Sequence, residues 1–322
     1  MITDPAEEPS KIGFGGRAND RQDRVVATGD LVEGGRRKIE HPADGTSSQR
    51  GLAVGERQGE LRGYAARHAR NLGGRRPCGR PPPYSRRMPT EPAPTTWDFP
   101  LDVDVDESGL VALGADLEPG TLLAAYRRGY FPMHVRSGGA LGWWSPDPRG
   151  VLELDDLHVS RSLRRSMQRF EIRVDSAFDA VITACADPGR PHGWIDQRIR
   201  AAYNRMHHMG WAHSVETWLE GELVGGLYGI AIGGLFAAES KFHRVTDASK
   251  AAVVGLVRGL ADRHPRLIDV QWQTEHLATL GVTEVSRHEY LQRLGAVLPS
   301  PESPLFSDPP PTLGAAALEC RP

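Results

Sequence analysis

Three apolar segments joined by very short links constrain the fold of this chain most strongly. Glu220-Gly221 joins the first segment to the second, and Gly233-Gly234 joins the second to the third. Links of two residues that contain glycine are typical of antiparallel β-hairpins. We therefore predict three consecutive antiparallel strands, over residues 213–219, 223–232 and 235–242.

Helical patterns and further strands surround this meander. Ser160 is a predicted N-cap, and Ser286 with Glu289 forms a predicted capping box. Helices are predicted from Pro119 to Gly129, over 161–170, 177–186, 196–208 and 248–263, before Gly281 and after Ser286. Further strands are predicted over 110–113, 141–144, 151–154 and 267–272. This layout predicts an α+β fold with helices packed on a mostly antiparallel sheet.

Composition limits the kinds of partner that the chain can bind. The 322 residues carry a net charge of −2, so no global basic field points to nucleic acid. Residues 1–94 hold 17 Lys and Arg against 12 Asp and Glu, and the remainder holds 22 against 29. The three cysteines are widely spaced, and no metal-ligand motif or apolar run of membrane-spanning length occurs. We expect a cytoplasmic protein without a bound metal.

The two ends of the chain differ from its middle. Residues 1–94 are rich in Gly, Arg and Pro and lack apolar periodicity, so we predict that they are disordered. We expect translation to begin at or near Met88, which would make the preceding part a non-native extension; the alternative is a basic arm that binds RNA. The predicted regions are a small N-terminal domain (95–157), a main domain (158–298) and a flexible tail (299–322).

An acid and an amide occupy alternate positions of one apolar strand. Side chains alternate between the faces of a strand, so Asp269 and Gln271 are predicted on one face with Leu267. Burying this pair is costly unless it meets partners or a substrate; a polar strand end satisfied by nearby loops is the alternative. Glu239 is predicted on one face with Lys241, either as a solvated ion pair or as an acid that forms an anionic pocket with Asp269.

A basic helix and a glycine cluster bear on nucleotide binding. Arg161, Arg165 and Arg169 recur at intervals of four, so their side chains can follow a phosphate backbone; an ordinary solvated helix face is the alternative. The glycines at 225, 226 and 229 lie within a predicted strand. They do not form the GxGxxG turn of a dinucleotide-binding fold.

Taken together, eight stretches in order closely resemble the bacterial leucyl/phenylalanyl-tRNA–protein transferase family. They lie within residues 99–294 and read GLVALGADLEPGTLLAAYRRGYFP, WWSPDPRGVL, LHVSRSLRR, GWIDQRI, AHSVETW, ELVGGLYGIAIGGLFAAES, ASKAA and LIDVQ. The resemblance implies a main domain with a GNAT-like, acetyltransferase-type fold after a small α/β N-terminal domain. It also implies a cytoplasmic enzyme that requires no cofactor and no metal.

The resemblance further implies the reaction. Leucine or phenylalanine, and less well methionine, would pass from leucyl-tRNA or phenylalanyl-tRNA to the α-amino group of a protein that begins with Lys or Arg. The product would be marked for degradation. No membrane partner is implied.

The resemblance also places the family's catalytic pair on Asp269 and Gln271 and its active-site acid on Glu239. From the chemistry of the reaction we expect Asp269 to orient Gln271 and accept or relay a proton, Gln271 to bind the reacting amine or carbonyl, and Glu239 to help hold the acceptor's cationic side chain. Positions of the aminoacyl-adenosine pocket fall on Met133, Trp194, Leu227, Phe236, Lys241 and Leu256, and tRNA-binding positions fall on Arg161, Arg164, Arg165 and Lys250.

Three positions depart from the family pattern. Lys241 and Asp247 replace a common Met and a common Asn, and Met133 stands where many relatives carry Trp. Two other functions fit parts of the sequence. A coenzyme A-dependent acetyltransferase would need a glycine-bearing pyrophosphate loop, and the segment HRVTDASK lacks those glycines. A non-catalytic tRNA-binding module has only the basic helix in its favour.

Overall fold

The computed structural model describes residues 89–103, 105, 108–135, 139–189 and 193–307, together with the backbone of residues 37–38. The predictions about the N-terminal extension, including the start at Met88 and the RNA-binding arm, lie largely outside these residues. Residues 308–322 of the predicted tail also lie outside them.

Residues beyond both predicted outer boundaries, at positions 95 and 298, are packed against the main domain. Thr90 donates its N–H to the carbonyl of Met209 (2.8 Å) and accepts a bond from the Trp211 indole, so the chain is already packed at residue 90. At the other end, Leu305 is buried and the Arg266 guanidinium donates to the carbonyl of Pro301 (2.8 Å). The predicted tail is therefore packed as far as Ser307. The prediction missed this packing because a Pro-rich sequence gives no sign of contacts with distant residues.

Seven strands of the described residues form the main sheet, in the order β12-β6-β11-β10-β9-β8-β7. Strands β10 and β11 are parallel, and each other neighbouring pair is antiparallel. Their bounds are Arg149–Leu152 (β6), Glu171–Val174 (β7), Ala212–Leu219 (β8), Glu222–Ile232 (β9), Leu235–His243 (β10), Leu267–Gln271 (β11) and Thr283–Val285 (β12). The mixed α+β character predicted from the sequence is confirmed, while the GNAT-like assignment stays a prediction.

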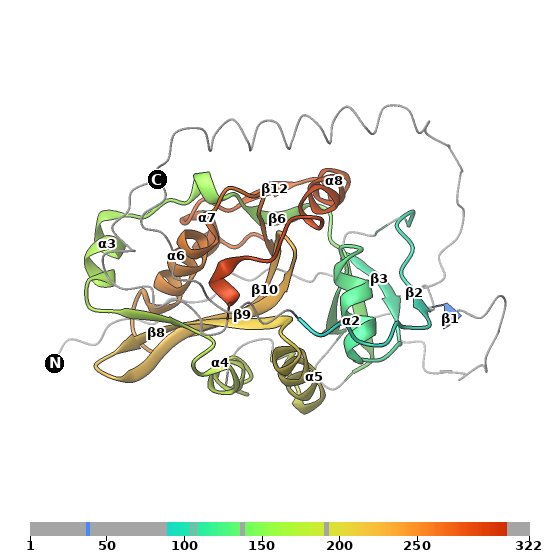
Figure 1. Cartoon of the computed structure of the whole chain (residues 1–322), viewed down its shortest axis with the longest axis horizontal. Helices are drawn as coiled ribbons and strands as arrows, with labels where there is room; N and C mark the ends of the chain where they lie inside the picture. Colours follow the sequence, from blue (N-terminus) through green and yellow to red (C-terminus); the bar gives the residue numbers. More distant parts are fainter. Residues whose placement is uncertain are drawn as a thin grey trace, which may run out of the picture.

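Helices cover both faces of this sheet (Figure 1). One face packs against α6, and the other packs against α4 and α5. The helices of the main domain are α3 (Arg161–Met167), α4 (Phe178–Cys185), α5 (Gln197–His208), α6 (Ala248–Leu260), α7 (Glu275–Ala278) and α8 (Arg287–Val297); single turns of 3-10 helix are η1 (Leu154–Asp156) and η2 (Pro304–Phe306). Each face therefore has its own apolar core.

A smaller unit precedes the main sheet and lies at one end of it (Figure 1). Helix α2 (Pro119–Tyr126) packs on a three-stranded antiparallel sheet in the order β3-β5-β4, with Leu122 and Trp143 fully buried. The strands are β3 (Leu110–Leu113), β4 (Phe131–His134) and β5 (Leu141–Trp144); the short strands β1 (Arg37–Lys38) and β2 (Trp97–Asp98) pair in parallel.

Local sequence signals account for the helix starts. The Ser160 hydroxyl accepts a bond from the Leu163 amide (3.1 Å), and the Asp196 carboxylate accepts one from the Ile199 amide (2.8 Å). Ser286 accepts from the Glu289 amide, but the Glu289 carboxylate binds Arg293 and does not return to the cap. Only half of the predicted capping box therefore forms.

Several strands of three or four residues were harder to predict. Strands β4, β7 and β12 were not predicted, and β6, whose partners lie far away in the sequence, was assigned to the N-terminal unit. In the structure β6 lies between β12 and β11 of the main sheet, where Val151 pairs with both Thr283 and Asp269. Its placement depends on residues more than 100 positions away, which no local pattern encodes.

Candidate active site

The main sheet opens where its two parallel strands separate. Pairing between β10 and β11 ends at Ala237 and Asp269. Beyond that point β10 continues beside β9 and β11 continues beside β6, and each strand has a register shift there. A bulge adds an unpaired residue and bends its strand. The diverging strands therefore leave a gap in the sheet.

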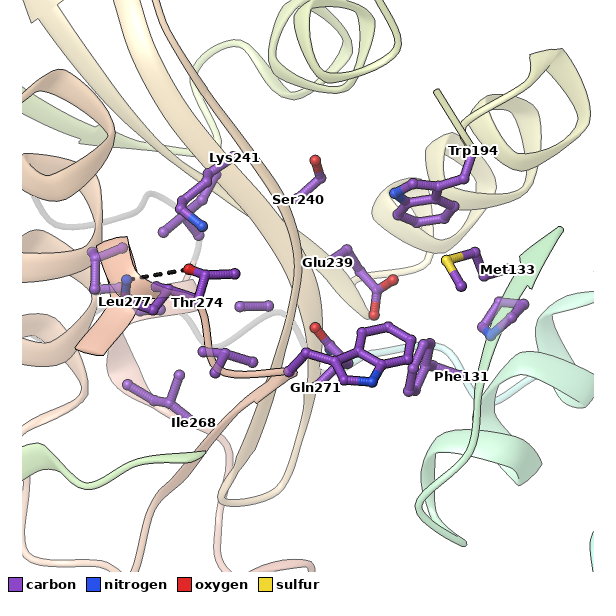
Figure 2. A pocket seen from close by; sticks show the side chains of 17 residues that line it. Phe131, Met133, Trp194, Glu239, Ser240, Lys241, Ile268, Gln271, Thr274 and Leu277 are labelled. Carbon is purple, nitrogen blue, oxygen red and sulfur yellow. Dashed lines mark hydrogen bonds between the residues drawn. The ribbon is translucent and has the colours of Figure 1, made fainter. Parts of the chain in front are cut away.

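A cavity of about 280 Å³ occupies this gap (Figure 2). Residues of both diverging strands line it, with α6, α7, β4 and Trp194 completing the wall. The lining residues are Phe131, Pro132, Met133, Trp194, Leu227, Ala238, Glu239, Ser240, Lys241, Val253, Leu256, Ile268, Val270, Gln271, Trp272, Thr274 and Leu277. The wall is largely apolar and carries two ionisable side chains, Glu239 and Lys241.

Five of the six predicted pocket residues line this cavity: Met133, Trp194, Leu227, Lys241 and Leu256. Phe236 does not, because it is fully buried and stacks on Phe306 with 5.5 Å between ring centroids. Several lining residues were missed, among them Phe131, Val270, Trp272 and Leu277. No sequence signal marked these apolar residues as different from ordinary core.

Gln271 reaches the cavity through an unusual backbone conformation. Its φ is +62°, and the register shift lies between Asp269 and Gln271. A left-handed conformation costs a non-glycine residue about 1–2 kcal/mol. The Gln271 side chain joins Ile268, Val270 and Trp272 in the cavity wall, so its predicted position on one face with Asp269 is wrong. Among the described residues, its buried Nε2 has no hydrogen-bond partner.

Asp269 is fully buried and does not line the cavity. Its carboxylate accepts two bonds from the Arg149 guanidinium (2.9 and 2.7 Å), one from the Tyr290 hydroxyl (2.9 Å) and one from the backbone N–H of Gln271 (2.9 Å). A group enclosed in this way cannot contact substrate. The orienting role predicted for Asp269 fits this geometry, whereas direct proton transfer with substrate does not.

Glu239 lies at the cavity and is bound by two tyrosines that sequence patterns placed only in helix cores. The Tyr126 hydroxyl donates to Oε1 (2.6 Å) and the Tyr203 hydroxyl to Oε2 (3.1 Å), and the two hydroxyls also contact each other. Burial raises the pKa of Glu239 to about 8, and the two hydrogen bonds lower it only in part. Burial and the nearby carboxylate raise the pKa of both tyrosines, so each hydroxyl remains a donor.

The predicted anionic pocket of Glu239 and Asp269 does not form. The charge of Asp269 is compensated by Arg149, and Asp269 lies outside the cavity. In Figure 2, Glu239 lies on the side of Met133, whereas Lys241 lies on the side of Thr274 and Leu277. The cavity is therefore acidic toward one side and basic toward the other.

Cations gather beside the Lys241 side of the cavity. Burial, followed by the charges of Lys241 and Lys250, lowers the pKa of His276 to about 4. The Lys250 ammonium donates to the Thr279 hydroxyl (3.2 Å). Lys250 therefore lies close to this side of the cavity, although it does not line it.

The basic helix α3 packs on α6 near the same side. Arg161, Arg164 and Arg165 are all exposed. The Ser166 hydroxyl donates to the Asp247 carboxylate (2.7 Å) and so ties α3 to the start of α6. Asp247 has a φ of +67°, a conformation that Asn and Asp tolerate better than most residues. The departure from Asn at this position therefore keeps a residue that suits the backbone.

Metal ligands and membrane spans are both missing from the part of the chain that the structure describes. The described residues contain no group of three or more His, Cys, Asp or Glu that could hold a metal ion. Within the same residues, no helix is both long and apolar enough to cross a membrane.

Comparison with known proteins places the chain in a family. The family model described as "Leucyl/phenylalanyl-tRNA protein transferase" matches residues 151–295, and the model of that family's N-terminal domain matches residues 115–147.

Individual relatives agree. Proteins named leucyl/phenylalanyl-tRNA–protein transferase are 51% identical over 189 residues in Azoarcus sp., 50% over 194 residues in Nitrosospira multiformis and 49% over 187 residues in Gloeobacter violaceus. These matches cover 58%, 59% and 58% of this chain, and 80%, 83% and 96% of the respective relatives. The chain therefore belongs to the leucyl/phenylalanyl-tRNA–protein transferase family and is an aminoacyltransferase enzyme.

Proposed function

We propose that this protein transfers leucine or phenylalanine, and less well methionine, from aminoacyl-tRNA to the α-amino group of proteins that begin with Lys or Arg. The modified protein is thereby marked for degradation. The reaction takes place in the cytoplasm and uses neither a cofactor nor a metal, because the aminoacyl ester is already activated.

The observation that carries this proposal is the composition of the cavity. Met133, Trp194, Leu227 and Leu256 give it apolar walls, which suit a leucine or phenylalanine side chain. A charged side chain would lose its hydration there without full compensation. The buried amide of Gln271 supplies a hydrogen-bond donor beside the apolar walls.

The transfer needs one bond made and one broken. The acceptor's α-amino nitrogen attacks the ester carbonyl carbon, and the carbon–oxygen bond to the tRNA ribose then breaks. The proton lost by the amine passes to the departing ribose oxygen. Gln271 donates through Nε2 to the carbonyl oxygen as negative charge develops on it. The α-amine has a pKa of about 7.7–8, so a useful neutral fraction exists near pH 7.

Glu239 binds the cationic side chain of the acceptor's first residue. It is the acidic residue of the cavity wall, and two tyrosine hydroxyls fix its carboxylate. A Lys or Arg side chain beside it favours the ionised carboxylate. This arrangement accounts for selection of a cationic first residue.

The arginines of α3 bind the acceptor stem of the tRNA. Arg161, Arg164 and Arg165 are exposed on α3, and Lys250 lies on the neighbouring helix α6. Neutralisation of backbone phosphates by these cations adds affinity that does not depend on sequence.

A transfer assay tests the proposal. The purified full chain is incubated with [14C]leucyl-tRNA and a peptide that begins with Arg, and label in the peptide is counted. The control acceptors are the same peptide with an acetylated N-terminus and one that begins with Gly. We expect transfer to the free Arg-initiated peptide alone, and a loss of roughly 100-fold for Gln271→Ala. Acetyl transfer from acetyl-CoA, or binding of charged tRNA without transfer, would overturn the proposal.

A further inference from the structure

We propose that Arg149 and Tyr290 are positioning residues of the reaction, which act on Gln271 through the buried carboxylate of Asp269. This inference rests on the proposed role of Gln271 in aminoacyl transfer. Neither residue lines the cavity, and neither was singled out by its sequence pattern.

The four hydrogen bonds to Asp269 define the orientation of its carboxylate. Oδ1 accepts from Arg149 Nε (2.9 Å) and from the backbone amide of Gln271 (2.9 Å). Oδ2 accepts from Arg149 Nη2 (2.7 Å) and from the Tyr290 hydroxyl (2.9 Å). A carboxylate has about four lone-pair sites, so every site of Asp269 is used. The side chain cannot rotate without losing several bonds at once.

The fixed orientation of the Asp269 carboxylate holds the backbone N–H of Gln271 in place. A residue at φ +62° is strained unless its surroundings hold it there. The bond from its N–H to Asp269 Oδ1 is one such restraint, and it lies one residue beyond the bulge in β11. The same conformation places the Gln271 side chain in the cavity wall. Asp269 thus fixes the position of a side-chain amide that it does not touch.

Arg149 and Tyr290 are what keep Asp269 in place. All three side chains are almost completely buried, and Arg149 supplies the compensating charge that a buried carboxylate requires. Burial and the neighbouring Asp269 carboxylate raise the pKa of Tyr290, so its hydroxyl remains a donor. The Tyr290 ring also faces the Arg149 guanidinium at 4.4 Å.

The Arg149 guanidinium is itself held in place by neighbouring residues. The Phe131 ring faces it at 4.9 Å, and Nη1 donates to the carbonyl of Gly129 (3.2 Å). A planar, bidentate and stacked site of this kind is specific to arginine. Lysine could supply the charge but not the paired bonds to Asp269.

A double-mutant cycle separates positioning from a purely structural role. Leucyl transfer at saturating substrate is measured for the wild type, Tyr290→Phe, Gln271→Ala and the double variant. We expect Tyr290→Phe to lower kcat roughly tenfold when Gln271 is present and to cause no further loss in Gln271→Ala. KM for charged tRNA should stay within twofold. Equal losses in both backgrounds, or none in the wild-type background, would overturn the proposal.

Tyr130→Phe is the matched control. Tyr130 is equally buried, and its hydroxyl donates to the carbonyl of Pro100, away from Asp269. We expect this variant to lose thermal stability without a change in kcat. Arg149→Lys, measured beside it, should lower kcat at least as much as Tyr290→Phe.

Amide hydrogen exchange tests the same inference without any turnover. In 15N-labelled protein, Tyr290→Phe should speed exchange of the Gln271 backbone amide at least tenfold relative to the amide of Ile199, which is bound to Asp196. Unchanged exchange at Gln271 would contradict the inference. A wild type that transfers no leucine would instead refute the proposed function, and the exchange result would still decide the positioning role.

Discussion

Gln271 shows how one backbone conformation decides which chemical group reaches a cavity. Simple alternation along β11 puts the amide on the face of Asp269, whereas a bulge and a φ of +62° turn it into the cavity wall. Asp269 remains buried and paired with Arg149. Gln271 therefore lines the cavity, whereas Asp269 holds the strand in its conformation.

The raised pKa of Glu239 makes stability depend on pH. An acid with a folded-state pKa of about 8 and an ordinary value when unfolded holds its proton more tightly in the folded state. Its ionisation therefore lowers the free energy of unfolding progressively between about pH 4.5 and pH 8. Glu239→Gln cannot ionise, so the stability of wild type relative to this variant should fall as the pH rises through that window.

Urea unfolding of both proteins at pH 5, 6.5 and 8 measures this difference without interference from the titrating α-amine of an acceptor. Other groups titrate alike in the two proteins, so they cancel in the comparison. A difference that stays constant with pH would show that the surroundings of Glu239 do not shift its pKa.

Lys241 is expected to limit the size of the transferred side chain. It lines the cavity on the side of Thr274 and Leu277, where an ammonium group is a poor neighbour for an aromatic side chain that must lose its hydration. Lys241→Met should make this side of the cavity apolar and raise the ratio of phenylalanine to leucine transfer roughly tenfold. Competition between the two charged tRNAs in one reaction measures the ratio. An unchanged ratio would show that Lys241 does not determine which side chain is transferred.

At the scale of elements, local patterns predicted the three-stranded meander β8–β9–β10 and the helix starts well. Strands β8, β9 and β10 and the caps at Ser160 and Asp196 depend on residues close in sequence. The bulges in β10 and β11 do not, because they arise where two parallel strands diverge to different partners. Hence seven of the 17 lining residues could be named through the resemblance, while the separation of Asp269 from Gln271 could not.

Helix α3 gives a prediction that belongs to this scale. Arg161→Gln combined with Arg165→Gln should raise KM for charged tRNA and reduce the slope of log KM against log salt by roughly 0.9 for each phosphate that is no longer neutralised. The kcat value should not change, because neither arginine lines the cavity. Arg173→Gln is the control, since Arg173 is already paired with Glu171. Equal salt slopes in the wild type, the double variant and Arg173→Gln would show that α3 does not contact the tRNA backbone.

For the whole molecule, the cavity belongs to two units at once. Phe131 and Met133 come from β4 of the N-terminal unit, whereas Gln271 and Leu256 come from the main domain. Local separation of the units should abolish transfer before the main sheet unfolds. Transfer is measured at a series of temperatures. The temperature at which half of the activity is lost should lie below the unfolding midpoint measured by far-UV circular dichroism, by roughly 2–4 °C for each kcal/mol of difference in stability. Coincident transitions would show a single cooperative unit.

The guanidinium of Arg149 has a consequence for recombination between relatives. It belongs to β6 of the main sheet, yet it stacks on Phe131 and binds the carbonyl of Gly129 in the preceding unit. A chimaera joined between residues 135 and 148 would import a foreign surface against this buried charge. We therefore expect an exchange to preserve the fold only when the turn at Gly129, strand β4 and Arg149 come from one parent.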